Sequence, residues 1–396
     1  MNPIRTRRVV QALALALVLV GVFGLQANCE RWCPFGGVEA IYTYVAEGDM
    51  LCSLGISNFF ILGGVLVATL LLRRAFCGYL CPLGTIGEWT RSLGRWMRIP
   101  EWHVPPAWER VLGLGKYVVL AVVLLLTYRA GELIFRGFDP CYALLSRHGE
   151  DITVWAYGIS GALLLGSLSV VVPFCRWLCP LAAVLNVFSR FGWTAVQRDR
   201  ETCRDCGACA RVCPMQIPVD RVLQVTAARC IACLQCVESC PTSAKRAGAL
   251  QWGPRWPARR WSQAVLIVIL LACTMGAVYA SYLIPIPSFI KRRGELPARV
   301  VTEVLWIDQL TCRGRANLLA FFLERDDDYA IPGYLRIAAW PGPGEAEVHI
   351  TFDPDKADLS ALRRAITEPY FEADTRFWRS SPFAIRGYDP LEEDLP

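Results

Sequence analysis

Eight cysteines between positions 203 and 240 constrain this chain more than any other feature of its sequence. They form two copies of the spacing C-x2-C-x2-C-x3-C-P. This is the bacterial iron–sulfur spacing, in which three cysteines of a run bind one [4Fe–4S] cluster and the fourth binds the other cluster. We therefore expect two crossed ligand sets: Cys203, Cys206, Cys209 and Cys240 for the first cluster, and Cys230, Cys233, Cys236 and Cys213 for the second.

Zinc ribbons and disulfide bonds are the alternatives for cysteines at such spacings. Two complete copies, each closed by a proline (Pro214 and Pro241), favour the iron–sulfur interpretation over both alternatives. Two clusters of this kind indicate one-electron transfer.

The rest of the 396-residue chain is apolar, with 54% hydrophobic residues and several long apolar runs that are typical of membrane-spanning helices. The formal charge of +6 is unevenly distributed, because residues 300–396 contain ten Lys or Arg against eighteen Asp or Glu. The excess positive charge therefore lies in the membrane part. Cytoplasmic loops account for it better than binding of nucleic acid does.

Five segments are apolar and long enough for a crossing of about 20 residues. They lie near residues 9–27, 56–72, 111–128, 152–174 and 263–284. A secretory signal is the alternative for the first segment, because three arginines precede it. The sequence after it is a poor cleavage site, which favours an uncleaved helix.

The lysines and arginines of the loops predict the orientation of these helices. The N-terminus and the loops 73–110 and 175–260 are basic and belong in the cytoplasm, whereas 28–55 and 129–151 belong outside. Residues 285–396 then also lie outside. We expect a multi-pass protein of the bacterial inner (cytoplasmic) membrane, with the ferredoxin module in the cytoplasm.

A repeat in the membrane part predicts a further cluster site. Phe76 to Leu83 reads FCGYLCPL, and Phe174 to Leu181 reads FCRWLCPL; we call these segments the first and second box. Internal repeats of membrane proteins usually pack about a pseudo-two-fold axis, with function at their interface. The cysteines of the two boxes would then meet at the cytoplasmic boundary as an inner quartet: Cys77, Cys81, Cys175 and Cys179.

A third C-x3-C-P lies in an outer loop. With the single cysteines that precede the repeated helices, it completes an outer quartet: Cys29, Cys33, Cys52 and Cys141. Four thiolates are enough for one [4Fe–4S] cluster, so one or two further clusters at the membrane faces are expected. Reduced dithiols are the alternative inside, and disulfides are the alternative outside.

Three other residues have simpler interpretations. Cys273 lies in the middle of the last expected span and should pack there as a small hydrophobic residue. Glu39 and Glu88 could exchange protons with a quinone, but a solvent-exposed helix face accounts for either residue more simply.

The boxes and the dicluster run together resemble the polytopic ferredoxin-type membrane proteins of the NapH, NosR and CcoG group, over residues 28–245. The resemblance implies electron transfer between the quinone pool and a redox partner, or reduction of copper during oxidase assembly. The C-terminal part differs from the immunoglobulin-like domain of the oxidase-assembly branch, and the outer flavin-binding domain of the NosR type is not recognised.

The C-terminal part predicts an α+β, ferredoxin-like (βαββαβ) domain. Its expected elements are a strand at 303–307, a helix at 315–324, strands at 334–339 and 346–352, and a helix at 359–366. The domain resembles heavy-metal-associated domains, but Arg315 replaces the second cysteine of their metal motif, so that Cys312 stands alone. Because Cu(I) prefers paired thiolates, we expect a degenerate domain that docks a client protein.

These features predict an α-helical membrane protein with about five transmembrane helices, an internal repeat and an inserted dicluster ferredoxin module. The expected boundaries are 1–199 for the membrane domain, 200–248 for the ferredoxin module, 249–290 for the last transmembrane helix and 291–396 for the soluble domain with its tail. The expected function is electron transfer between the ferredoxin module and a quinone or a redox partner at the membrane or its outer face, as a subunit of a quinone-linked oxidoreductase. Copper reduction or metalloenzyme assembly is the alternative.

Overall fold

The computed structural model describes residues 3–25, 32–47, 56–130, 134–146, 152–242, 248–256, 259–284, 286–293, 299–324, 333–342, 344–372 and 377–389. The chain divides into two compact units. The first unit comprises Met1–Glu39 and Ser57–Leu283, and the second comprises Ala40–Ile56 and Ile284–Pro396.

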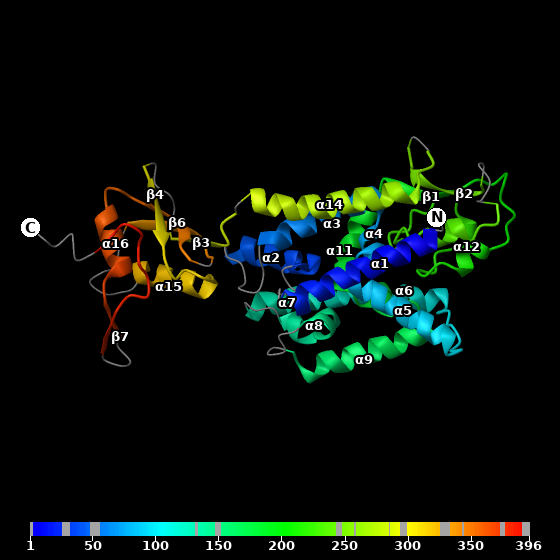
Figure 1. Cartoon of the computed structure of the whole chain (residues 1–396), viewed down its shortest axis with the longest axis horizontal. Helices are drawn as coiled ribbons and strands as arrows, with labels where there is room; N and C mark the ends of the chain where they lie inside the picture. The colour runs from blue at the N-terminus through cyan, green and yellow to red at the C-terminus, as the bar shows by residue number, and fades with distance from the viewer. Residues whose placement is uncertain are drawn as a thin grey trace, which may run out of the picture. The chain divides into compact units, whose positions relative to one another are not determined.

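The apolar helices of the first unit have roughly parallel axes, along which the chain runs in both directions (Figure 1). They are α1 (Pro3–Leu19, continued by a π-helical turn, Val20–Gly24), α3 (Ile56–Leu72), α7 (Gly115–Ala130), α9 (Val154–Ser169) and α14 (Gln263–Leu283). Shorter helices lie between them: α2 (Pro34–Glu47), α6 (Pro106–Leu112), a 3-10 helix (Ile134–Phe138) and α8 (Pro140–Leu145).

Three helical segments among the described residues are long and apolar enough to cross a membrane: Pro3–Gly24, Pro106–Arg129 and Gln263–Leu283. The other two expected spans correspond to the shorter apolar helices Ser57–Leu72 and Val154–Ser169. At a rise of about 1.5 Å per residue, the 16 residues of α9 reach about 24 Å, which is less than a hydrocarbon core of about 30 Å. Five crossings therefore stay a prediction.

Both short helices are followed by a turn through the left-handed backbone region. Arg73 directly follows α3 with a φ of 58°, and Val172 lies three residues beyond the end of α9 with a φ of 43°. This conformation is unusual for a β-branched residue, so the packing around buried Val172 must hold it there. The span expected at 152–174 is too long for this reason, since the helix ends at Ser169.

The repeat in the sequence is also a repeat in the structure. After α3 come the short helix α4 (Ala75–Tyr79) and then α5 (Pro82–Trp96). After α9 come the short helix α10 (Pro173–Trp177) and then α11 (Pro180–Ser189). In each half, therefore, the short helix contains the first cysteine of the box, and a proline begins the next helix directly after the second cysteine.

The two halves exchange hydrogen bonds where the chain leaves them. The N–H of Trp102, beyond α5, donates to the carbonyl of Ser169 at the end of α9 (3.0 Å). The N–H of Trp193, beyond α11, donates to the carbonyl of Leu70 near the end of α3 (2.7 Å). This reciprocal pairing is what pseudo-two-fold packing of the repeats requires.

The ferredoxin segment lies at one end of the first unit (Figure 1) and is framed by two antiparallel strands, β1 (Thr194–Arg198) and β2 (Leu250–Pro254). Each cysteine run contains one short helix, α12 (Ala208–Arg211) or α13 (Gln235–Glu238). Gly207 and Leu234 precede these helices with φ of 67° and 60°. The two runs therefore have equivalent backbone turns, each directly after the second cysteine of its run.

The second unit contains a four-stranded antiparallel sheet with the strand order β3-β5-β6-β4. Its main elements are β3 (Phe289–Arg292), β4 (Val301–Ile307), α15 (Arg313–Glu324), β5 (Tyr334–Trp340), β6 (Ala346–Phe352) and α16 (Leu359–Thr367), followed by the short hairpin of β7 (Tyr370–Glu372) and β8 (Phe377–Arg379). From β4 to α16 the elements have the expected order, and their ends lie within two residues of the expected ones.

The two edges of this sheet differ from the expectation. The sequence did not predict β3, which lies beside β5. On the opposite edge, Ile385 forms a bridge with Ile307 of β4, and the N–H of Asp308 donates to the carbonyl of Ala384 (2.8 Å). In a βαββαβ domain the last strand pairs with the first strand, which is β4 in this unit. Here the bridge between Ile307 and Ile385 lies where that last strand would be.

Candidate iron–sulfur sites

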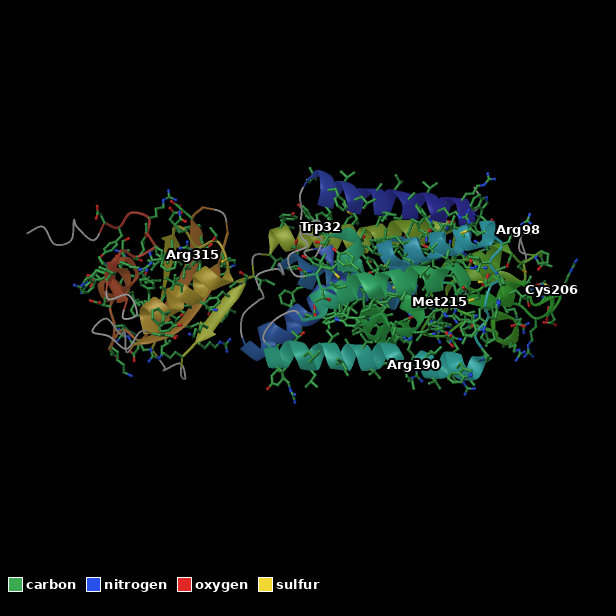
Figure 2. All side chains as sticks on the ribbon, turned by 90° about the horizontal axis from the view of Figure 1, so that it is seen from below. Trp32, Arg98, Arg190, Cys206, Met215 and Arg315 are labelled. Carbon is green, nitrogen blue, oxygen red and sulfur yellow. The ribbon has the colours of Figure 1, made fainter. Side chains whose placement is uncertain are left out.

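The first expected ligand set lines one cavity in the ferredoxin segment. All four of its cysteines contribute to the wall: Cys203, Cys206, Cys209 and Cys240. Burial raises the pKa of Cys209, and the nearby Asp220 and Cys240 raise it further. Cys206 is exposed and lies at the tip of the first unit (Figure 2). The structure thus brings Cys240 of the second run to the three cysteines of the first.

The second expected set is more deeply buried. Burial raises the pKa of Cys236 well above its usual value, and Cys233, Cys230 and Cys213 raise it further because they lie close by. The N–H of Ile217 points at the sulfur of Cys213 (3.4 Å). Cys213, which belongs to the first run, therefore lies among the three cysteines of the second.

The structure also brings the inner quartet together. Cys77 lies in α4 and Cys175 in α10, and both are buried, whereas Cys81 and Cys179 directly precede α5 and α11. Burial, together with the nearby thiols of Cys77 and Cys81, raises the pKa of Cys179 to about 12. Thiols from the two repeats therefore face one another.

The second cysteine of each box lies where a helix favours negative charge. The N–H groups of Gly84 and Leu83 point at the thiol of Cys81 and lower its pKa, against the larger effect of burial. The N–H of Ala182 does the same for Cys179. Helix N-termini stabilise thiolates, and cysteines bind iron as thiolates. The local backbone therefore fits a cluster ligand.

Arg74 is a cation that faces this quartet. Its side chain is fully buried, and Nη2 lies 3.8 Å from the sulfur of Cys77 and 3.4 Å from the carbonyl oxygen of Cys175. Nη1 donates to Oδ1 of Asn186 (3.1 Å), and Nε has no hydrogen-bond partner among the described residues. A buried charge without a counter-ion is costly. Four thiolates around an iron–sulfur core would compensate it, so these residues fit such a group.

The described residues contain no three His, Cys, Asp or Glu side chains close enough to bind one metal ion. A single zinc holds its sulfur ligands at about 2.3 Å, whereas a [4Fe–4S] cluster binds its cysteines at separate iron atoms and keeps them farther apart.

The first box packs directly against the second ferredoxin set. A Cβ atom at Gly78 would lie 2.7 Å from the carbonyl oxygen of Ile231, so a side chain does not fit there. The hydroxyl of Tyr79 donates to the carbonyl of Ala232 (3.4 Å), and the N–H of Arg74 donates to the carbonyl of Cys230 (3.3 Å). Backbone contacts therefore join the inner quartet to the loop that carries the second set.

Comparison with known proteins agrees with this arrangement. A family profile for a 4Fe-4S binding domain matches residues 54–100 and 153–197, which include the two boxes, and a profile for a 4Fe-4S dicluster domain matches residues 195–241. YccM of Escherichia coli, assigned to electron transport, is 30% identical over 287 residues, which cover 67% of this chain and 77% of YccM. The chain belongs to the YccM family of 4Fe-4S proteins.

Further relatives match smaller parts of this chain. The ferredoxin-type protein NapH of Escherichia coli is 31% identical over 260 residues, covering 59% of this chain and 85% of NapH. The regulatory protein NosR of Pseudomonas aeruginosa is 34% identical over 184 residues, which cover 45% of this chain but only 25% of NosR. No solved structure matches the chain significantly.

A buried ion pair holds the second box of this YccM-family chain. Arg176, inside the box, donates from Nε and Nη2 to the two carboxylate oxygens of Glu109 in α6 (3.1 and 2.5 Å). The indole N–H of Trp177 donates to the same carboxylate (2.9 Å). Arg176 also donates to Gln216 of the ferredoxin segment (2.9 Å), and Arg229 lies 3.5 Å from Glu109. The second box is therefore also tied to the ferredoxin segment.

Another ion pair lies beside the first box. Arg7 of α1 binds Glu88 of α5, and Glu88 also accepts hydrogen bonds from Gln11 (2.9 Å) and from Gln235 of the ferredoxin segment (3.0 Å). Glu88 is only 17% exposed. The expectation of a solvent-exposed face is therefore wrong for Glu88, and it is also wrong for Glu39, which is buried.

Half of the expected outer quartet falls within the described residues. Cys33 and Cys141 are described, whereas Cys29 and Cys52 lie outside them. Asp139 accepts a hydrogen bond from the N–H of Cys141 (2.9 Å) and lies close enough to Cys33 to raise its pKa, beside the larger effect of burial. As in the boxes, N–H groups at the start of a helix, here α2, point at the sulfur of Cys33.

The two remaining cysteines behave as isolated residues. Cys273 lies in α14, where a Cβ at Gly64 of α3 would come within 2.6 Å of its carbonyl oxygen, so the two helices pack closely there. Cys312 is exposed directly before α15, and Arg315 lies in the first turn of that helix (Figure 2). The likeness to heavy-metal-associated domains stays a prediction.

Proposed function

We propose that this protein is a membrane-bound iron–sulfur electron-transfer protein that exchanges electrons between its ferredoxin module and a quinone or a redox partner at the membrane or its outer face. The observation that carries the proposal is the packing of the first box on residues 230–232, which places two cysteine groups next to each other without an intervening domain. The names of YccM and NapH support the same chemistry.

In this proposal the ferredoxin module binds two [4Fe–4S] clusters in crossed ligation, and the inner quartet binds a third. Each cluster would supply one-electron chemistry when bound. The protein's own residues hold the thiolates, exclude water by burial and place a helix N-terminus or a cation next to the negative charge. A fourth cluster at the outer quartet is supported by Cys33, whose sulfur, like those of Cys81 and Cys179, faces N–H groups at the start of a helix.

The proposed topology has five crossings, with the ferredoxin module in the cytoplasm and the second unit outside. Within the first unit, Trp32 and Cys206 lie at opposite ends of the helices (Figure 2), which supports placing the outer and inner cysteines at different membrane faces. Three and five crossings are both odd numbers. With either count, a cytoplasmic N-terminus leaves the second unit on the outer side of the membrane. In this proposal the second unit is a ferredoxin-like domain that would dock a client protein there.

A cavity in the first unit supports a quinone as one partner. It has a volume of about 920 Å³, within the range of small-molecule sites. Its wall combines apolar residues of two candidate spans with Cys240 and with polar groups, among them Glu238, Arg260 and Gln263. An amphipathic ligand could enter from the bilayer between α1 and α14 and present its ring to the clusters.

The decisive experiment measures iron and acid-labile sulfide per chain, with EPR spectra of the reduced protein. Because each cluster contains four irons, we expect about twelve irons if the inner quartet binds a cluster, and about sixteen if the outer quartet does so as well. About eight irons would restrict the clusters to the ferredoxin module and make the inner quartet a dithiol site. Reduction of a quinone analogue by the reduced protein in liposomes tests the membrane partner separately.

A further inference from the structure

The two repeats differ at the residue three positions before the first cysteine of each box. Arg74 occupies this position in the first repeat, and Val172 occupies it in the second. Both are buried. The short helix does not therefore require an arginine before it, because the second repeat forms the equivalent short helix after a valine, although the backbone at that position differs (φ of −79° at Arg74 and 43° at Val172).

Arg74 contacts both cysteine groups at once. Its main-chain N–H donates to the carbonyl of Cys230, which belongs to the second ferredoxin set (3.3 Å). Its guanidinium approaches the sulfur of Cys77 and the carbonyl of Cys175 in the inner quartet (3.8 and 3.4 Å). A continuous path of covalent and hydrogen bonds therefore runs from Cys230 through Arg74 to Cys77.

The charge of Arg74 is directed at the quartet rather than at a carboxylate. Its described partners are an amide, a carbonyl and a thiol. The neighbouring Arg73 is also buried, but its guanidinium donates to the carbonyls of Thr194 and Ser189 (2.8 and 3.2 Å). Arg91, a third buried arginine, lies near Glu101 (3.5 Å) and donates to main-chain carbonyls. Of these three arginines, and among the described residues, Arg74 is the one whose guanidinium has a hydrogen bond to a thiol of the inner quartet.

We propose that Arg74 is a positioning residue that raises the reduction potential of a cluster in the inner quartet and links it to the second ferredoxin cluster. The inference rests on the proposed function, because it requires a cluster in that quartet. In the step concerned, one electron leaves the second ferredoxin cluster, which is oxidised, and reduces the inner cluster. Arginine stays protonated throughout, so no proton accompanies the electron, and the fixed positive charge stabilises the added negative charge.

The test compares Arg74→Gln, Arg74→Lys and the control Arg91→Gln in the full-length protein. The iron content of each variant is measured chemically. The midpoint potential of the inner cluster is measured by EPR-monitored redox titration. Arg74→Gln should lower the ratio of reduced to oxidised inner cluster at a fixed ambient potential at least tenfold, which corresponds to about 59 mV for one electron. Arg74→Lys should give a smaller shift, because it keeps the charge but not the fork of donors. Arg91→Gln should leave this potential unchanged.

Each result either supports or overturns the proposed role of Arg74. Selective loss of the inner cluster from Arg74→Gln, with retention in Arg74→Lys, would also support the role of the charge. An unchanged potential in Arg74→Gln with full iron content, or loss of the inner cluster from both Arg74 variants, would overturn the potential-setting role. About eight irons in the unmodified protein would instead overturn the proposed function itself.

Discussion

The first and second boxes show how a repeated backbone can serve two different electrostatic purposes. Both boxes contain a short helix with one cysteine, and a second cysteine directly before a proline-initiated helix. The first box has a glycine at position 78, where the second has Arg176, and it is preceded by Arg74, where the second has Val172. The repeat therefore sets where the thiols lie, and the residues that differ set the charge around them and the way each box meets the ferredoxin segment.

The difference separates redox tuning from attachment. The first box contacts the ferredoxin segment through the backbone of Gly78. Arg74, which precedes this box, directs its guanidinium at the thiol of Cys77. The second box turns its cation, Arg176, away from the thiols to a buried carboxylate. We infer that the first box is the route of the electron, whereas the second fastens the module to the membrane helices.

Removal of one thiol from either box should have the largest effect, and the same effect. Cys77→Ser and Cys179→Ser should each lose the inner cluster, about four irons per chain, and should stop electron transfer to a quinone analogue. The EPR signals of both ferredoxin clusters should persist. Iron that stays at the unmodified value in both variants would show that these cysteines bind no cluster.

Removal of the buried carboxylate should distinguish the boxes by stability. Glu109→Gln leaves Arg176 buried without its anion, and breaking a buried ion pair in this way costs about 3–5 kcal/mol. The matched change Glu88→Gln should cost less, because Glu88 is partly exposed and keeps amide partners. The temperature at which each variant loses its cluster absorbance measures the difference. Equal losses in the two variants would contradict the view that the second box is the anchor.

A side chain at Gly78 should disturb the contact between the first box and the ferredoxin segment. The Cβ atom of Gly78→Ala would lie 2.7 Å from the carbonyl of Ile231, so one of the two backbones must move. Overpacking of this kind costs about 1–3 kcal/mol, and electron transfer between the second ferredoxin cluster and the inner quartet should slow. Gly158→Ala in α9, which has open space around it, is the control and should leave the transfer rate unchanged. Equal rates in the two variants would place the electron route elsewhere.

The smallest difference between the boxes is expected at their equivalent aromatic residues. Trp177→Phe removes a hydrogen bond to the carboxylate of Glu109, worth about 1.5–3 kcal/mol. Tyr79→Phe removes two neutral hydrogen bonds, the long one to the carbonyl of Ala232 and one accepted from the amide of Gln263 (3.1 Å), each worth about 1 kcal/mol or less. Thermal loss of cluster absorbance should rank the tryptophan variant as the less stable one. The reverse order would assign the firmer attachment to the first box.

The sequence predicted the features that depend on local spacing. Ligand geometry restricts cysteines within a run, so the grouping of Cys213 with the second run and of Cys240 with the first could be anticipated from the motif alone. The same order of helices in the two repeats followed in the same way from two similar octapeptides. The helices and strands from β4 to α16 followed from hydrophobic periodicity, whereas β3, β7 and β8 did not.

The sequence did not predict contacts between residues far apart in the chain. Glu109 and Arg176 are separated by 67 positions, and Arg7 and Glu88 by 81 positions. No helical or strand period relates residues at such separations. The end of α9 was missed for another reason, since the left-handed turn at Val172 involves a residue that has no preference for that conformation.

The reciprocal hydrogen bonds at the exits of the repeats also fix the order in which the protein can mature. The guanidinium of Arg73 and the carbonyl of Leu70 find their partners only at positions 189–194. A nascent chain that ends after α5 therefore holds two thiols of the inner quartet with neither their counterparts nor their supporting contacts. In the proposed function, delivery of iron and sulfide to this quartet would therefore wait until the ribosome has translated the second repeat, and until then Cys77 and Cys81 would need reducing conditions.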